Sequence, residues 1–318
     1  MGKISEKVSV VIPTYNRSEL LKKAVYSLQL QRHQNLEIII VDDCSTDDTE
    51  AVVGDMHDPR IKYFRHPINK GGSEARNTGI KHATGNYVGF LDSDDQWLPD
   101  KLEKQLAIFT SNPEVGAVYT GVKLFDDRQI IKEIVPRYRG DILPMLIESN
   151  CIDTTSSVLV KTALLHEING FESALPSCQD WDLYLRLSKI TNFDFVKDSM
   201  VLFFQHSGER ISTNNAAVLS GQLYIFEAYK ALAKELGDGI FGKFSINIFK
   251  TLLKVGITSH DKEAVKLARK VLLEAAFEKN GSIKAFVYYF STFLPLKVLG
   301  ILYKQSKKNN KFSEILST

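Results

Sequence analysis

Short apolar runs alternate with segments of helical periodicity over residues 8–125. The run at 8–13 holds no charged side chain, as expected of a strand buried on both faces of a parallel sheet. Apolar side chains then recur three and four positions apart, which predicts a helix with Ser18 as its N-cap. This rhythm predicts an α/β fold with parallel strands joined by right-handed crossover helices. We expect strands at 8–13, 36–41, 61–64, 87–91 and 117–125, and a helix with Pro99 in its first turn.

The pattern becomes mixed after residue 150 and helical after residue 214. The expected elements are a strand near 157–160, a helix over 162–168 that Gly170 ends, a helix at 180–188 and a strand at 201–205. Farther on, apolar residues follow helical spacing, as in Ala264, Leu267, Ala268, Val271 and Leu272. We therefore predict an α/β domain over 1–214 that carries the chemistry and an all-helical region over 215–318.

Composition excludes several classes of protein. The 40 Lys and Arg against 38 Asp and Glu leave a net charge of +2, so we expect no nucleic-acid partner. Cys44, Cys151 and Cys178 are too few and too far apart for a disulfide framework or a zinc site. Residues 1–7 lack the apolar core of a secretory signal, and no uninterrupted apolar run is long enough for a spanning helix. These features favour a cytoplasmic protein.

Carboxylates follow two of the expected strands. Asp42 and Asp43 come directly after one, and Asp92, Ser93, Asp94 and Asp95 come after another. Ligands of open α/β sheets bind beyond the carboxyl ends of the strands, so both groups face one ligand region. Carboxylates beside a bare diphosphate would repel it, and all-oxygen ligation favours Mg²⁺ or Mn²⁺ as the neutralising cation. The alternative is that the second acidic run only caps the following helix.

A glycine pair precedes another expected helix, in the segment NKGGSEARN at 69–77. Amides at the start of the helix and the side chains of Lys70 and Arg76 could meet phosphate. The segment lacks the order of a Walker motif, and such a pair is more often a turn.

Five segments together resemble family 2 glycosyltransferases with the GT-A fold: VSVVIPTYNR, VDDCSTDDT, NKGGSEARNTGI, YVGFLDSDDQW and SCQDWDLYLRL, over residues 7–213. The resemblance implies a Rossmann-like mixed sheet, a nucleotide diphosphate sugar as donor and a DxD-type metal site holding Mn²⁺ or Mg²⁺. Its implied nucleotide-binding residues are Pro13, Thr14, Tyr15, Asp42, Arg76, Asp92 and Ser93, to which we add Lys70 at the diphosphate. Asp94 would hold the metal, and His206 is the matching position for a second ligand, although imidazole is a softer ligand than these ions prefer.

Glycosyl transfer also needs a base for the acceptor hydroxyl. The family usually carries Glu-Asp or Gln-Asp before a Trp-containing helix, and Gln179, Asp180 and Trp181 match this pattern. Asp180 is therefore the expected base. The alternative is that it only acts as the N-cap of the helix. One base opposite the leaving diphosphate implies a single displacement with inversion of the anomeric centre. We expect segment 208–215 to close over the donor.

Several alternatives concern the substrates. A sugar nucleotidyltransferase would carry a Gly-rich loop with Arg after the first strand, where this chain has PTYNR. A silent sugar-nucleotide sensor would not need Asp42, Asp94 and Asp180 together. With a polyprenyl phosphate as acceptor, the Asp180→Asn variant would retain activity.

The expected reaction moves a sugar from a UDP-sugar to a glycan or lipid-linked saccharide, as in cell-surface polysaccharide biosynthesis. Apolar residues 285–303 with lysines through 311 predict peripheral contact with the inner membrane face. The alternative is that this segment packs against the other tail helices or against a second subunit of a homo-oligomer.

Overall fold

The computed structural model describes residues 6–126, 129–205 and 214–276, together with Ala285, Tyr288, Tyr289 and Phe293. The chain divides into two compact units. The first comprises Met1–Leu146, Asn150–Ala174 and Gln179–Gly208, and the second comprises Ile147–Ser149, Leu175–Cys178 and Glu209–Thr318. The three cysteines are free thiols.

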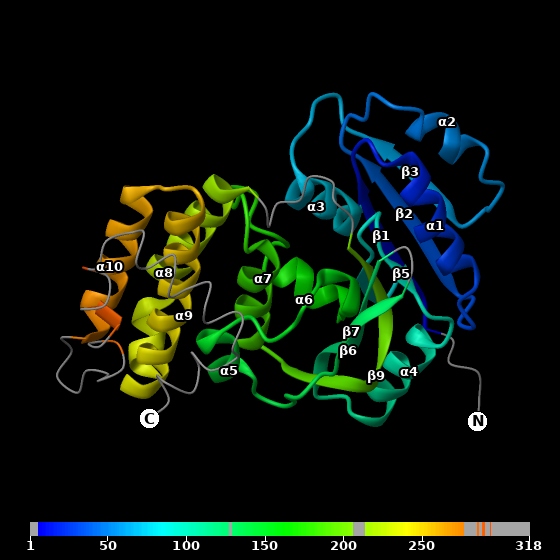
Figure 1. Cartoon of the computed structure of the whole chain (residues 1–318). Coiled ribbons are helices and arrows are strands. Elements are labelled where there is room, and N and C mark those ends of the chain that lie inside the picture. Colours follow the sequence, from blue (N-terminus) through cyan, green and yellow to red (C-terminus); the bar gives the residue numbers. More distant parts are fainter. Residues whose placement is uncertain are drawn as a thin grey trace. The chain divides into compact units, whose positions relative to one another are not determined.

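A mixed β-sheet forms the centre of the first unit (Figure 1). Within the described residues it has nine strands in the order β3-β2-β1-β4-β8-β6-β9-β5, with β7 paired to β6. Strands β1 to β4 run parallel to one another, and β8 is antiparallel to β4. The predicted α/β fold is therefore confirmed. The strands are β1 (Val8–Thr14), β2 (Leu36–Asp42), β3 (Ile61–Arg65), β4 (Tyr87–Phe90), β5 (Gln96–Trp97), β6 (Val115–Phe125), β7 (Ile130–Ile134), β8 (Leu159–Lys161) and β9 (Asn192–Phe204).

Helices cover this sheet because its central strands, such as β1 and β2, are apolar on both faces. Val10 and Ile12 of β1 pack in a core cluster with Leu21 and Val25 of α1. Val11 is packed against α3, where a Cβ on Gly79 would meet Val11 Cγ1 at 2.2 Å. Gly79 is therefore required for this close approach of helix and strand. The helices of this unit are α1 (Ser18–Gln29), α2 (Thr49–Gly54), α3 (Gly72–His82), α4 (Lys101–Ser111), α6 (Thr162–Glu167) and α7 (Gln179–Ser188), with a 3₁₀ turn η1 (Thr155–Ser157); α5 (Leu143–Glu148) extends from it into the second unit.

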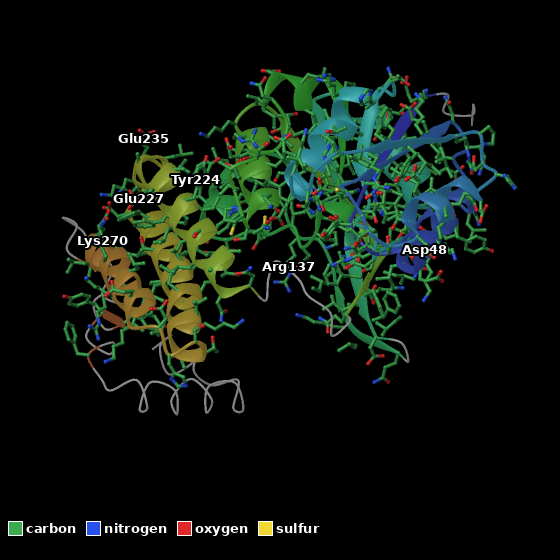
Figure 2. The ribbon with its side chains drawn as sticks, turned by 90° about the horizontal axis from the view of Figure 1, so that it is seen from above. Asp48, Arg137, Tyr224, Glu227, Glu235 and Lys270 are labelled. Carbon is green, nitrogen blue, oxygen red and sulfur yellow. The ribbon has the colours of Figure 1, made fainter. Side chains whose placement is uncertain are left out.

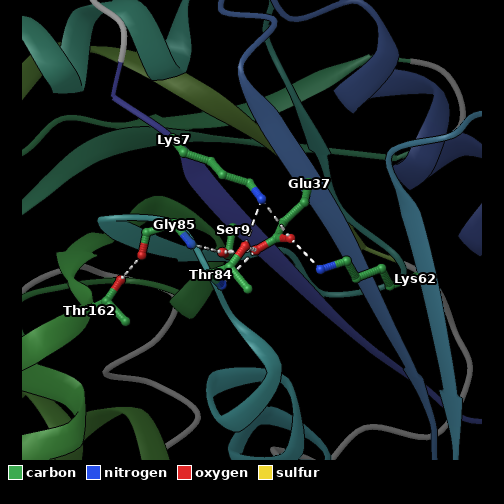
Figure 3. A network of polar contacts seen from close by, with 7 residues as sticks. All are labelled: Lys7, Ser9, Glu37, Lys62, Thr84, Gly85 and Thr162. Carbon is green, nitrogen blue, oxygen red and sulfur yellow. Dashed lines mark hydrogen bonds and ion pairs between the residues drawn. The ribbon is translucent and has the colours of Figure 1, made fainter.

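A buried carboxylate ties together the chain at the amino ends of the parallel strands (Figure 3). Glu37 of β2 accepts hydrogen bonds from Ser9 of β1, Lys62 of β3 and both the backbone and side chain of Thr84. Lys7 also contacts this carboxylate, at 3.1 Å. Burial raises the pKa of Glu37, but the hydrogen bonds from Lys62, Ser9 and Thr84 outweigh this effect and hold the pKa at about 2. The network lies at the strand ends opposite Thr14 and Asp42, so its role is structural.

Two predicted helix starts are wrong. Arg17 is the N-cap residue of α1, and Ser18 is its first helical residue. The Ser18 amide is satisfied by Asp47 Oδ2 at 3.1 Å, so a distant side chain replaces a local cap. Helix α4 begins at Lys101, so Pro99 precedes the helix and does not lie in its first turn.

Predicted strand boundaries also change in the second half of the sheet. β9 begins at Asn192 rather than residue 201, and Ser157 belongs to η1 rather than to β8. The short β5 and the edge strand β7 were not predicted. β5 has two residues, and Ile130 and Ile131 of β7 are exposed, so neither gives a buried-strand pattern.

The second unit contains α8 (Asn215–Glu235), α9 (Asp238–Thr258) and α10 (Lys262–Ala276). Phe226 of α8 stacks with Phe241 and Phe244 of α9. Tyr224 and Glu227 lie on the exposed side of α8 (Figure 2). The predicted apolar stripe of α10 is largely confirmed, since its members Ala264, Ala268, Val271 and Leu272 are buried.

No helix among the described residues is both long and apolar enough to cross a bilayer. The predicted membrane or oligomer segment, 285–311, lies outside the described residues except at four positions. The division into functional domains at residue 214 stays a prediction.

Candidate functional site

The carboxyl ends of β1 and β2 bring two predicted nucleotide-binding residues side by side, because Thr14 pairs with Asp42 in the parallel register. Asp42 is fully buried, and its carboxylate accepts hydrogen bonds from the Ser45 amide at 2.8 Å and the Tyr63 hydroxyl at 2.6 Å. Thr14 is also buried, and its Oγ1 has no hydrogen-bond partner among the described residues. Tyr15, by contrast, is 46% exposed. These strand ends thus present a fixed carboxylate, an unsatisfied hydroxyl and an accessible aromatic ring.

The second acidic run forms a loop held by buried hydrogen bonds. Asp95 is buried, accepts a hydrogen bond from Ser156 Oγ at 2.6 Å and donates its backbone amide to Asp92 O at 2.9 Å. The Ser156 hydroxyl also accepts from the Asp92 amide at 3.1 Å. Burial, reinforced by the charges of Asp92 and Asp94, raises the pKa of Asp95 well above its usual range. Sequence reasoning missed Asp95 and Ser156 as anchors of this loop, because the contact spans about sixty residues of sequence.

Asp94, the predicted metal ligand, forms an ion pair with Arg17 at 2.7 Å. Its carboxylate offers the hard oxygen donors that Mg²⁺ and Mn²⁺ prefer, and Asp92 lies in the same loop. Within the described ranges, no group of three or more His, Cys, Asp or Glu side chains is placed to hold a metal ion. The site therefore fits a divalent ion only if a ligand such as a diphosphate supplies further oxygens. His206, the other predicted ligand, lies outside the described residues, as does most of the predicted closing segment 208–215.

The glycine loop is organised by Asp43. Its carboxylate accepts the backbone amides of Lys70 at 2.8 Å and Gly71 at 2.7 Å, and it contacts His66 Nδ1 at 2.7 Å. Gly71 has φ +88°, a backbone conformation that residues other than glycine rarely adopt. The Lys70 side chain is exposed. Asp43 thus fixes the turn that opens α3, a role that its adjacency to Asp42 in the sequence did not reveal.

Helix α3 carries Arg76 toward the acidic loop. Arg76 Nη2 donates to Asp92 Oδ1 at 2.5 Å, while Arg76 Nε is buried without a hydrogen-bond partner in the described part of the chain. The Asp92 carboxylate also accepts a hydrogen bond from Thr155 at 3.3 Å. The structure therefore joins two of the predicted nucleotide-binding residues, Arg76 and Asp92, in one ion pair. Ser93, between the two loop aspartates, is buried.

Asp180 lies in the first turn of α7. Its carboxylate accepts a hydrogen bond from Asn150 Nδ2 at 3.0 Å, and Trp181 Nε1 anchors the same turn by donating to Leu146 O at 2.6 Å. Burial raises the pKa of the Asp180 carboxyl, against the hydrogen bonds from Trp181 and Asn150 and the charge of Arg76. A carboxylate with a raised pKa is a better proton acceptor than an ordinary aspartate.

Tyr184 lies one helical turn after Asp180 and is fully buried, with a hydroxyl that has no hydrogen-bond partner in the described part of the chain. Burial and the negative charges of Asp180 and Asp92 raise its pKa, whereas Arg76 lowers it. Arg76, Asp92 and Asp180 thus act on the same group. The structure places the predicted base in the electrostatic field of the predicted nucleotide-binding residues.

Comparisons with known proteins bear on the family and the fold. The sequence model of glycosyl transferase family 2 matches residues 9–163. An Escherichia coli protein, UDP-Glc:alpha-D-GlcNAc-diphosphoundecaprenol beta-1,3-glucosyltransferase WfgD, is 30% identical over 68% of this chain and 83% of its own length. An uncharacterized glycosyltransferase of Haemophilus influenzae is 28% identical over 88% of this chain and 93% of its own. The match to a third relative, from Rickettsia conorii, is 32% identical and spans 75% of this chain but only 38% of that protein.

Solved structures confirm the GT-A fold. TarS 1–349 of Staphylococcus aureus in complex with UDP-GlcNAc superposes with a TM-score of 0.61 at 19% identity, covering 94% of this chain and 92% of that one. A mannosyltransferase of Pyrobaculum calidifontis in complex with GDP-Man and Mn²⁺ gives a TM-score of 0.57 at 21% identity, covering 98% and 84%. The match to the family model and the similarity to the E. coli glucosyltransferase, which the alignment covers over 83% of its length, show that the chain belongs to glycosyltransferase family 2.

Proposed function

We propose that the protein is an inverting glycosyltransferase that moves a sugar from a nucleoside diphosphate sugar to a hydroxyl of a glycan or lipid-linked saccharide. The observation that carries this proposal is the grouping of Asp180, whose pKa burial raises, with the Arg76–Asp92 pair. A UDP-sugar is the first donor to test, because the E. coli relative is named for UDP-Glc and the TarS complex holds UDP-GlcNAc. The E. coli name also supports a lipid-linked acceptor.

Buried polar atoms without partners support the assignment of the donor site. Thr14 Oγ1 and Arg76 Nε belong to predicted nucleotide-binding residues, and Ser73 Oγ lies in the first turn of α3 between them in sequence. A buried polar atom left without a hydrogen bond destabilises a protein by about 1 to 3 kcal/mol. A bound nucleotide would offset this loss. Pro13, Tyr15 and Asp42 would hold the nucleoside, Ser93 and Asp92 the ribose, and Lys70 the diphosphate.

Asp94 would hold a divalent metal, Mn²⁺ or Mg²⁺, with His206 as the second protein ligand. The metal would neutralise the charge that builds up on the departing diphosphate. Arg76 supplies a fixed positive charge beside the same loop, since it is bonded to Asp92. No protein acid is then needed to protonate the leaving group.

Asp180 would act as the general base. The acceptor oxygen forms a bond to the anomeric carbon while the bond from that carbon to the diphosphate oxygen breaks. The hydroxyl proton moves to the Asp180 carboxylate, and the bonding electrons leave with the nucleoside diphosphate. Because attack and departure take place on opposite faces of the sugar, one displacement inverts the anomeric configuration.

A donor screen followed by product analysis tests this function. Nucleotide sugars are first compared by thermal shift with and without Mn²⁺, and a stabilising donor is then given to saccharide acceptors. The proposal predicts a Mn²⁺-dependent shift and, by NMR, a β-linked product from an α-linked donor. A product that keeps the donor configuration would contradict the inverting mechanism. Because membrane contact at the cytoplasmic face is one of the two roles predicted for segment 285–311, the assay should include acceptor in anionic vesicles.

A further inference from the structure

Arg17 lies between β1 and α1, and its Nη1 donates to Asp94 Oδ2 at 2.7 Å. The two side chains are only 30% and 13% exposed, so this ion pair is partly shielded from water. Asp94 is the carboxylate to which we assign the metal. In this structure it bonds a cation that belongs to the protein itself.

The backbone on both sides of Arg17 is fixed by the loop after β2. The Asn16 amide donates to Ser45 Oγ at 2.9 Å, and Asn16 Oδ1 accepts the Thr46 amide at 2.7 Å. On the other side, the Ser18 amide donates to Asp47 at 3.1 Å. The guanidinium is therefore carried on a fixed base by a long, rotatable side chain, and it can change partner without moving the backbone.

The loop that carries Asp94 is equally well held, through the buried bonds of Asp95 to Ser156 and to Asp92. Asp94 can thus keep its place while the cation beside it changes. A guanidinium and a divalent ion on one carboxylate repel each other, because both carry positive charge within a few ångströms, so each weakens the binding of the other. The protein also supplies few other metal ligands within the described ranges. A diphosphate would provide both the missing oxygens and a new anionic partner for Arg17.

We infer that Arg17 is an exchangeable counter-ion of Asp94, which opposes binding of the metal alone and makes metal and nucleotide binding mutually dependent. This inference rests on the proposed function, since it takes Asp94 as the metal ligand. In the donor-free protein the guanidinium neutralises Asp94. With a nucleotide diphosphate and a divalent metal bound, Asp94 would serve the metal and the Arg17 guanidinium would turn to the phosphate oxygens. Arg17 thus couples the binding of the metal to the binding of the nucleotide.

Mn²⁺ binding, followed by the EPR signal of the free ion, tests the exchange without any turnover. The titration compares the parent protein, Arg17→Met and Arg17→Lys, each with Mn²⁺ alone and with saturating UDP. Arg32→Met is the matched control, since it removes an arginine that is 67% exposed and pairs with Asp100. For Arg17→Met we expect the affinity for Mn²⁺ alone to rise about tenfold, and the factor by which UDP strengthens Mn²⁺ binding to fall by a similar amount. Arg17→Lys keeps the charge and should stay near the parent, as should Arg32→Met.

Two failures can be told apart in the same titration. If the parent protein bound no Mn²⁺ even with UDP, the metal site of the proposed function would fall, and this inference with it. If the parent bound Mn²⁺ with UDP but Arg17→Met left both the affinity for Mn²⁺ alone and the effect of UDP unchanged, only the counter-ion role would be wrong. Circular dichroism spectra that match the parent would show that the variants are folded.

Discussion

Arg76 donates a hydrogen bond to Asp92 at 2.5 Å and thereby joins α3 to the acidic loop after β4. The Arg76 side chain is mostly buried, and its Nε still lacks a partner in the described part of the chain. A charged group so placed can bind one anion through each edge of the guanidinium. The ion pair therefore holds the acidic loop in place, and the Nε–H group of Arg76 is left to bind a second anion.

Arg76→Met should weaken donor binding and transfer together. Hydrogen bonds to charged groups contribute about 1.5 to 3 kcal/mol, which corresponds to a loss of about tenfold to a hundredfold. The dissociation constant for UDP, measured by calorimetry with Mn²⁺ present, checks this. Lys81→Met is the matched control, because Lys81 lies on the exposed side of the same helix. Equal loss in both variants would mean that net charge rather than the Arg76 contact is responsible.

Asp43→Asn should loosen the glycine loop. The amide group would place a donor against one of the backbone amides of Lys70 and Gly71, which both now donate to the carboxylate. We expect a loss of about 1 to 3 kcal/mol in stability, together with weaker UDP binding. Urea unfolding and calorimetry measure the two effects. Asp48→Asn, at an exposed position of the neighbouring loop (Figure 2), should change neither quantity. Parent-like UDP binding by Asp43→Asn would show that the loop does not depend on this carboxylate.

Glu37 should make stability depend on acid pH. Its folded pKa is about 2 against an ordinary value of 4.5, so the folded state binds the proton less readily than the unfolded state does. Its contribution is therefore complete above about pH 4.5 and is lost as the pH falls toward 2. Glu37→Gln should lose about 1 to 3 kcal/mol near neutral pH and less in acid. Urea unfolding of both proteins over this range checks the difference, with exposed Glu19→Gln as control. A difference that stayed constant with pH would argue against the ionised network.

The pH dependence of transfer should reflect Asp180. Because burial raises the pKa of this carboxyl, the base becomes protonated at a higher pH than an ordinary aspartate. The rate should therefore fall, as the pH is lowered, at a pH above the usual aspartate range. The pH profile of kcat/KM measures this limb, and removal of the Asn150 hydrogen bond by Asn150→Ala should move it to still higher pH. A limb unmoved by Asn150→Ala would assign it to another group.

The strands that were predicted best are those encoded by continuous apolar runs. β1, β2 and β6 agree closely with the expected strands because their central residues are buried on both faces. β3 also lies where it was expected, although its residues are only partly buried or exposed. The first half of β9 was missed because polar and charged residues interrupt its pattern, as in the segment NFDFVKDS. The cap of α1 was misjudged because Asp47, far along the chain, satisfies the Ser18 amide.

The site shows the same limit. Strand ends and motif resemblance pointed to Asp42, Asp92, Asp94 and Asp180. They could not show that Asp43 fixes the glycine loop or that Arg17 pairs with Asp94, since both contacts join segments distant in sequence. Positions that act through other side chains therefore became visible only in the folded chain.

The most direct test of the account is transfer by Asp180→Asn under saturating donor, with UDP affinity measured on the same preparation. Removal of a general base typically slows a reaction by about a hundredfold to ten-thousandfold, and the amide has the same shape as the carboxylate. We expect a fall of this size in kcat, with UDP affinity within about twofold of the parent. Asp198→Asn, at an exposed ion pair with Lys104, is the control and should transfer normally. If Asp180→Asn transferred sugar at the parent rate while Asp198→Asn did the same, Asp180 would not be the base and the proposed mechanism would be wrong.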